Sequence, residues 1–158
     1  MGKILDRFFL LTAIVLLFLV ILIVYDALSR YLFSSGSVAL QELEWHLFDL
    51  VILFSIAYTF RMNSHVRVDI FYANYSQKTQ LLVDIVATLL FIVPFSALII
   101  YIGFDFTLMS YLQHEASSDP GGLTSRWIVK SFMPLAFVFL ALEALSSLYR
   151  KIGEYRAL

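Results

Sequence analysis

Long apolar stretches alternate with short polar segments along the whole chain. The uncharged runs 8–25 and 85–104 contain 18 and 20 residues, and about 20 apolar residues span the hydrocarbon core of a bilayer as a helix. Two further stretches carry charges mostly near their ends, where long side chains reach water. The pattern predicts an all-α membrane protein, a single four-helix transmembrane domain over 1–158 with spans at about 8–28, 40–60, 82–104 and 127–149.

The first apolar stretch follows Lys3 and Arg7 and ends near Ala-Leu-Ser at 27–29, which resembles a signal-peptide cleavage site. Its apolar run exceeds the roughly 7–15 residues of a signal-peptide core. We therefore expect a retained membrane span rather than a cleaved signal.

The third helix is predicted to be long and kinked. Between 81 and 114 the only interruptions are Pro94 and Gly103. A helix of that length exceeds a hydrocarbon core of about 30 Å, so it must tilt, break near Gly103, or project outside. Pro94 removes one backbone hydrogen bond and predicts the kink.

Turn signals mark the helix boundaries. The segment 34–37, Ser-Ser-Gly-Ser, is predicted to end the first helix, and Ser37 to cap the second. Asp-Pro-Gly-Gly at 119–122 predicts a turn before the last helix, with Thr124 or Ser125 as its cap.

Basic residues predict the orientation. Under the four-span topology eight lie on one side of the membrane and three, Arg30, Arg126 and Lys130, on the other. Cytoplasmic segments carry the excess of Lys and Arg. We expect both termini and the loop 61–80 in the cytoplasm, and the connections 31–39 and 105–126 outside.

Composition agrees with a bilayer as the surroundings. Hydrophobic residues make up 61% of the chain and charged residues 15%, whereas soluble domains carry about 25% charged residues. The net charge of −1 provides no basic field for nucleic acid. Without cysteine, disulfides and thiolate metal sites are excluded. We expect the helices to settle in lipid as a bundle.

An acidic group at the start of the second span is one candidate for chemistry. Glu42, Trp45 and Asp49 share a helical face, and Glu44 lies beside them. Membrane carboxylates bind cations, relay protons or pair with basic residues. Arg30 and Lys130 lie on the same side, so ion pairing is the favoured interpretation, and we expect no metal site.

A second candidate follows that span. In His65-Val66-Arg67-Val68-Asp69 the polar side chains would share one face of an extended segment. The strip is either a docking surface for a partner or an ordinary solvated loop. No nucleophile accompanies it, so no catalytic residue is predicted.

Histidines and aromatic residues add little chemistry. A haem would need two facing histidines, and His46 with His114 is the one pair on a common side, so we predict no cofactor. Trp45 and Trp127 fit an aromatic belt at the outer interface. Small-residue packing motifs are scarce, so helix contacts are expected to rely on shape and on polar pairs such as Ser55, Ser96 and Ser131.

Several short motifs occur in a characteristic order. They are Arg30-Tyr31-Leu32-Phe33, Gln41-Glu42-Leu43, Ala57-Tyr58-Thr59-Phe60-Arg61, the strip at 65–69, Arg126-Trp127-Ile128-Val129-Lys130-Ser131, and Met133-Pro134-Leu135-Ala136-Phe137. Over essentially its whole length the chain resembles the small membrane subunit, DctQ type, of tripartite ATP-independent periplasmic (TRAP) transporters.

The resemblance implies a non-catalytic membrane subunit in the bacterial inner membrane. A periplasmic binding protein would deliver a small organic acid, and a large TRAP membrane subunit would perform sodium-coupled symport on the scaffold of this chain. The implied contact residues, for the large subunit or for structural ion pairs, are Arg30, Glu42, Trp45, Asp49, Arg61, His65, Arg67, Asp69 and Lys130, with Glu115 and Asp119 for the binding protein.

Two other functions fit a small helical membrane protein. One is a haem- or quinone-associated membrane anchor of a respiratory enzyme, which a Soret band would reveal. The other is a self-sufficient small transporter, which sodium-driven uptake by the chain alone would reveal.

Overall fold

The computed structural model describes residues 2–62 and 72–158 of the chain. All regular structure in these residues is helical. The elements are α1 (Gly2–Phe33), α2 (Val38–Arg61), α4 (Gln77–Ala87), the π-helical turn η1 (Thr88–Ile92), α5 (Val93–Leu112) and α6 (Trp127–Ala157).

Four helical stretches are long and apolar enough to cross a membrane, which confirms the predicted fold class. They cover Phe9–Phe33, Val38–Arg61, Gln77–Leu112 and Trp127–Ala157. The helices exceed the predicted spans because polar flanks also form helix. The third stretch is 36 residues long, as its lack of stop signals predicted.

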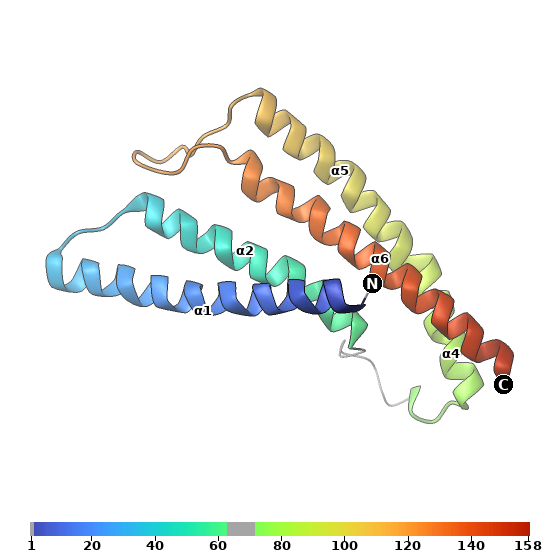
Figure 1. Ribbon diagram of the computed structural model, residues 1–158. Coiled ribbons are helices and arrows are strands. Elements are labelled where there is room, and N and C mark those ends of the chain that lie inside the picture. Colours follow the sequence, from blue (N-terminus) through green and yellow to red (C-terminus); the bar gives the residue numbers. More distant parts are fainter. Residues whose placement is uncertain (1, 63–71) are drawn as a thin grey trace.

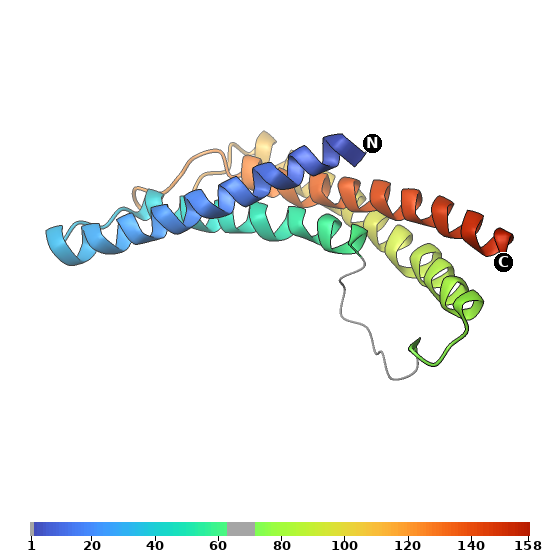
Figure 2. The same ribbon diagram turned by 60° about the horizontal axis from the view of Figure 1, so that its bottom comes forward.

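The helices lie side by side in one open layer rather than in the bundle we expected (Figures 1 and 2). α1 packs on α2, α2 packs on α6, and α6 packs on α4 and α5. α1 and α5 therefore form the two edges. Lipid is as apolar as the side chains that face it, so nothing drives helices in a membrane to close around a common core.

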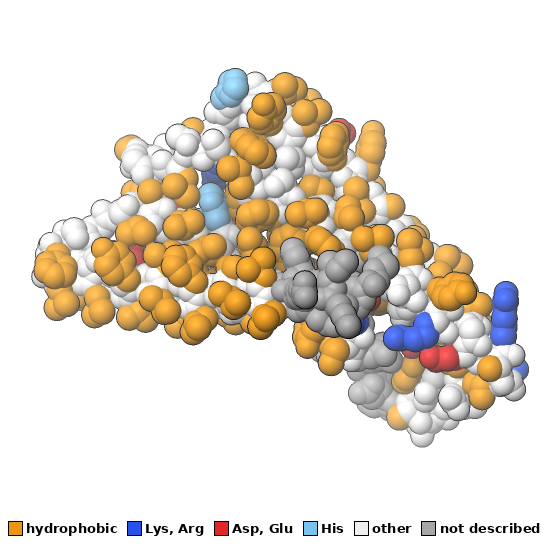
Figure 3. Space-filling view, in the orientation of Figure 1, with side chains coloured by type: hydrophobic (Ala, Val, Ile, Leu, Met, Phe, Trp, Pro, Cys, Tyr) orange, Lys and Arg blue, Asp and Glu red, His pale blue; other side chains and the backbone are white. Residues whose placement is uncertain are grey.

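The two ends of this layer differ. One end carries the connections 34–37 and 113–126, and we call it the connection end; the other carries both termini and is called the terminal end (Figure 1). Most large apolar side chains stay uncovered, and they spread over the visible face (Figure 3). Only 11% to 22% of the most apolar window of each span is buried, so lipid or partner proteins must cover the rest.

Many of the buried contacts lie where α2 and α6 meet. Ala57 of α2 and Ala144 of α6 have no exposed surface, and the Phe54 ring meets Phe139 edge-on at 5.8 Å between ring centroids. Small residues thus allow α2 and α6 to approach, and aromatic rings fill the space beside them.

Gly103 marks the crossing of α5 and α6 and not the helix break that was one of our alternatives. α5 continues through it to Leu112. A Cβ atom at this position would lie 3.1 Å from Met133 Cε and from Pro134 Cβ. The glycine therefore provides close helix contact, while the predicted kink at Pro94 stays a prediction.

The π-helical turn precedes Pro94 in the third helix. The hydroxyl of Thr88 donates to the carbonyl of Asp84 at 2.7 Å, and the amide of Val93 donates to the carbonyl of Thr88. The wider π spacing immediately before a residue without an amide hydrogen accommodates the interruption of the regular ladder.

Two expectations on helix ends and one on helix pairing can be compared with the structure. The Ser37 hydroxyl accepts from the Leu40 amide at 3.4 Å, which confirms the cap of α2. The prediction for α6 is wrong, because its N-cap is Arg126 and no side chain caps it. The interhelical serine pairs are also wrong, since the hydroxyls of Ser55, Ser96 and Ser131 donate to carbonyls of their own helices.

Candidate functional site

The connection between α5 and α6 is fastened to the start of α2. The Glu42 carboxylate accepts a hydrogen bond from the Ser117 hydroxyl and another, at 2.5 Å, from the Leu123 amide. Glu42 projects from the second turn of α2, whereas both donors lie beyond the third span. This carboxylate therefore holds the two halves of the connection end together.

A second acid braces the same loop against α6. Glu115 pairs with Lys130, and the Glu115 carbonyl accepts from the Arg126 amide at 3.0 Å. The Lys130 ammonium, hydrogen-bonded to Glu115, lowers the pKa of that carboxyl below its ordinary value of 4.5. The ammonium also lies 4.0 Å from the centre of the Phe106 ring, a favourable cation–π distance.

The loop depends on glycine at its tip. Gly121 has a φ of 82°, which side chains with a Cβ rarely adopt. At Gly122 a Cβ would lie 2.5 Å from Ser117 Oγ and 2.8 Å from Glu42 Oε2. Only glycine lets the backbone come this close to the carboxylate. We call Glu42, Glu115, Ser117, Leu123 and Lys130 the loop cluster.

A polar hollow of about 340 Å³ opens beside the loop cluster. Four of the residues that we predicted from the sequence line it, together with His46, Arg126 and three others; the four are Glu42, Trp45, Asp49 and Asp119. The predicted face of α2 thus meets the predicted loop at one place on the connection end.

A second charged group lies between α1 and α2. Asp26 is completely buried, and its carboxylate is 2.9 Å from the guanidinium of Arg30. Glu44 of α2 interacts electrostatically with both residues. Leu19, Ile23, Arg30, Gln41, Glu44, Trp45 and Phe48 line a hollow of about 420 Å³, which we call the α1–α2 groove.

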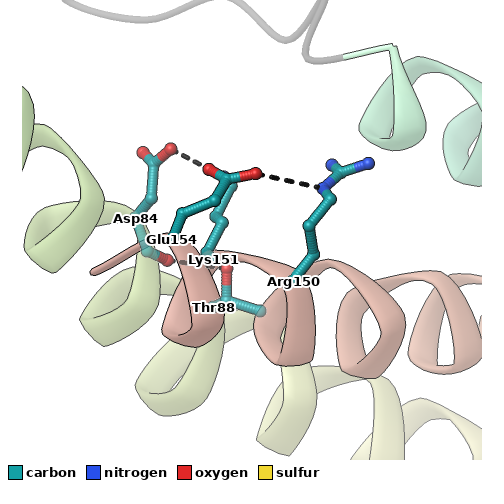
Figure 4. Close-up of polar contacts among 5 residues, drawn as sticks. All are labelled: Asp84, Thr88, Arg150, Lys151 and Glu154. Atoms are coloured by element: carbon teal, nitrogen blue, oxygen red, sulfur yellow. Dashed lines mark hydrogen bonds and ion pairs between the residues drawn. The ribbon is translucent and has the colours of Figure 1, made fainter. Parts of the chain in front are cut away.

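A third charged group joins α4 to α6 near the terminal end (Figure 4). The Lys151 ammonium donates to the Asp84 carboxylate at 2.6 Å, and the two side chains are 9% and 15% exposed. Beside this pair, Arg150 and Glu154 form a looser, exposed contact of 4.0 Å on the same helix. The buried pair fixes α4 against the last helix and borders an apolar hollow of about 540 Å³.

These sites consist of ion pairs and hydrogen bonds between helices. No cluster of three or more His, Asp or Glu side chains suited to a metal ion occurs in residues 9–62 and 72–158. What the arrangement can do chemically is position helices and present polar groups at the connection end.

Comparison with protein families supplies the identity. The model of the family described as tripartite ATP-independent periplasmic transporters, DctQ component, matches residues 19–154. The chain belongs to the DctQ family. A search of curated protein sequences finds no match. The DctQ component is the small membrane subunit of a TRAP transporter, so with its four apolar helices this subunit is a multi-pass inner membrane protein.

The predicted residues of this DctQ-family subunit fall into separate places. Trp45 is 66% exposed and lines both the polar hollow and the α1–α2 groove. Arg61 is the last residue of α2, at the terminal end. His65, Arg67 and Asp69 lie outside the described residues.

The two cations expected to pair with the acidic group of α2 form their close ion pairs with other residues, although Arg30 also interacts electrostatically with Glu44. Arg30 pairs with Asp26, four residues earlier on its own helix, and Lys130 pairs with Glu115. Helix geometry favours the first pairing, because residues four apart are neighbours on a helix surface. Glu42 instead accepts hydrogen bonds from the loop.

Sequence reasoning missed three participants. Asp26 could have been found, since it ends the first apolar run and precedes Arg30 by four positions. Asp84 and Lys151 are 67 residues apart, and no local pattern connects them.

Proposed function

We propose that this DctQ-family chain is a non-catalytic brace for the large membrane subunit of its TRAP transporter. The large subunit would carry out sodium-coupled uptake of a small organic acid that a periplasmic binding protein delivers. The observation that carries the proposal is the open layer of helices, which leaves the apolar side chains of four long helices mostly uncovered.

Such a layer is suited to packing against a larger helical protein. Helices in a membrane associate by shape and by polar contacts rather than by escape from water, and a layer offers long helix faces for both. The charged groups between the helices stiffen the layer so that it can act as a support. Enclosure of substrate by the chain itself would require a closed bundle.

Orientation follows from the basic residues. The eight-to-three distribution of Lys and Arg supports both termini in the cytoplasm. The connection end then faces the periplasm, where the binding protein arrives. Tags at the two termini that reacted with impermeant reagents from opposite sides of the membrane would contradict this orientation.

The 113–126 loop is our proposed contact for the binding protein. Asp119 is exposed at its tip, beside the turn Gly121-Gly122, while Glu115 lies at its base, where it pairs with Lys130. Charge reversal at Asp119 should weaken docking without unfolding the loop, and reversal at Glu115 should disturb both. Docking and transport that are unchanged in both variants would remove this contact from the proposal.

Reconstitution tests the function as a whole. The large subunit, purified with and without this chain, is placed in proteoliposomes with binding protein and a radiolabelled carboxylate under a sodium gradient. We expect uptake only when this chain is present. Equal uptake without it, or sodium-driven uptake by this chain alone, would overturn the role of a brace.

A further inference from the structure

Two carboxyl groups in and next to the α1–α2 groove have incomplete hydrogen bonding: Glu44 lines the groove, and Asp26 is buried beside Arg30, which also lines it. Asp26 Oδ1 and Glu44 Oε1 are buried, and neither has a hydrogen-bond partner among the described residues. Asp26 at least has the guanidinium of Arg30 at 2.9 Å. Buried polar atoms are almost always satisfied in native proteins, so these oxygens are open to a further hydrogen-bond donor.

Both carboxyl groups lie at similar depth. Asp26 precedes the end of α1 at Phe33 by seven residues, and Glu44 follows the start of α2 at Val38 by six. At the rise of an α-helix, each lies about 10 Å from the connection end of its helix. Neither position is in open water, and long side chains reach both from the interface.

The charge of the group is unbalanced. Arg30 compensates Asp26, and Glu44 adds a second carboxylate that Asp26 repels. Lys130 and Arg126, the other basic residues near the connection end, lie beside the loop cluster and the polar hollow, not in the groove. Burying an unpaired carboxylate at this depth is unfavourable in free energy. A cation from another protein that paired with it would offset this penalty.

The groove has the shape and lining of a site for a long basic side chain. Arg30, Gln41 and Glu44 form its polar part, and Leu19, Ile23 and Phe48 its apolar part. Methylene stems of Lys and Arg pack on such apolar walls while their charged heads find a carboxylate. Trp45, exposed at the rim, adds an aromatic face that suits a cation.

We propose that the α1–α2 groove receives a lysine or arginine side chain from the large membrane subunit, whose charge pairs with Glu44. The inference rests on the proposed function and names one contact within it. It also assigns a task to α1, whose main packing partner in the described chain is α2.

Co-purification of the full chain with its co-expressed large subunit tests the contact. Glu44→Gln keeps the shape of the side chain and removes its charge, and Glu154→Gln, at an exposed site on α6, is the matched control. We expect recovery of the large subunit to fall about tenfold with Glu44→Gln and to stay unchanged with Glu154→Gln. Thermal unfolding of each variant in detergent accompanies the measurement.

Charge exchange provides a test that misfolding cannot imitate. Glu44→Lys should abolish co-purification, and replacing the partner's cation by glutamate should restore it. Each membrane-embedded Lys and Arg of the large subunit is changed to Glu in turn against Glu44→Lys. One restoring pair supports the proposal, and failure of every pair overturns it.

The outcomes separate this inference from the proposed function. A wild-type chain that does not bind the large subunit overturns the proposed function and the inference with it. If the wild-type chain binds the large subunit and Glu44→Gln binds it equally well, the groove contact alone is overturned. A Glu44 carboxyl without charge would give this result. A defect seen only in nanodiscs containing phosphatidylethanolamine, and absent in phosphatidylcholine, assigns the groove to a lipid headgroup and overturns the protein partner.

Discussion

The two halves of the helix layer are held together in different ways. In the half formed by α4, η1, α5 and α6, Gly103 allows close backbone contact and the Asp84–Lys151 pair fastens the helices to one another. In the half formed by α1 and α2, α1 rests mainly on α2, with a ring contact of 4.6 Å between Phe9 and Tyr58. Carboxylate oxygens of Asp26 and Glu44 there accept no hydrogen bond from the described residues. The difference teaches that the α4–α6 half is fixed by a close helix crossing and a buried ion pair within the chain, whereas the α1–α2 half leaves carboxylate oxygens of Asp26 and Glu44 open to a partner.

The largest effect should come from breaking the buried Asp84–Lys151 pair in the half formed by α4, η1, α5 and α6. Asp84→Ala leaves the Lys151 ammonium buried without its carboxylate, and we expect a loss of about 3 kcal/mol in unfolding free energy. Thermal unfolding in mild detergent measures it. The double variant Asp84→Leu, Lys151→Leu should recover most of the loss, because two apolar residues need no pairing there. A single variant as stable as wild type would show that the pair does not hold α4.

Close packing of α5 on α6 comes next. Gly103→Leu places a side chain against Met133 and Pro134, where even a Cβ would lie at 3.1 Å, and should cost about 1–3 kcal/mol through overpacking. Gly153→Leu is the control, since nothing lies within 4 Å of a Cβ there. If both leucine variants unfold at the same temperature, α5 and α6 are not held together by close backbone contact at Gly103.

The loop cluster joins the two halves, and its loss should be local. In Glu42→Ala the Ser117 hydroxyl and the Leu123 amide lose their acceptor. We expect the Leu123 amide to exchange its hydrogen about tenfold faster while α6 stays protected. Asp49→Asn, on the same helix, serves as the control. Unchanged exchange in Glu42→Ala would mean that the loop stays in place without this carboxylate.

The smallest expected effect is the loss of stability of the loop 113–126 at low pH. The Glu115 carboxyl has a lowered pKa because of Lys130, so its contribution to loop stability is complete above the ordinary value of 4.5. It is lost as the pH falls through the lower folded-state value. Hydrogen exchange in 113–126 should therefore be constant, after correction for the intrinsic rate, from pH 7 to pH 5, and loop opening should increase below 4.5. Lys130→Met should reduce this dependence, and an identical profile in that variant would contradict the pairing.

Much of the fold followed from hydrophobic length. The four apolar stretches predicted four helices, and Ser37 predicted the start of α2. The bundle was not predicted correctly, because apolar periodicity is uninformative when packed and lipid-facing side chains are both apolar. The cap of α6 was wrong for a local reason: the Glu115 carbonyl binds the Arg126 amide and so fixes the backbone that enters the helix.

For the candidate site, the sequence indicated which charged residues take part better than it indicated which residues they pair with. Glu42, Glu115 and Lys130 were singled out, yet their pairings depend on how a loop 75 residues away folds back on α2. Asp26 was missed even though its four-residue spacing from Arg30 is visible in the sequence.

By itself, the sequence determined that this chain spans a membrane four times and belongs to the DctQ family, because apolar length and ordered motifs are properties of the linear chain. Only the tertiary structure decided that the helices form a layer, that Asp84 meets Lys151, and that Glu44 of α2 comes close to Asp26 of α1. The physical reason is that ion pairs and close helix crossings join residues far apart in sequence, and their geometry exists only after the helices have packed.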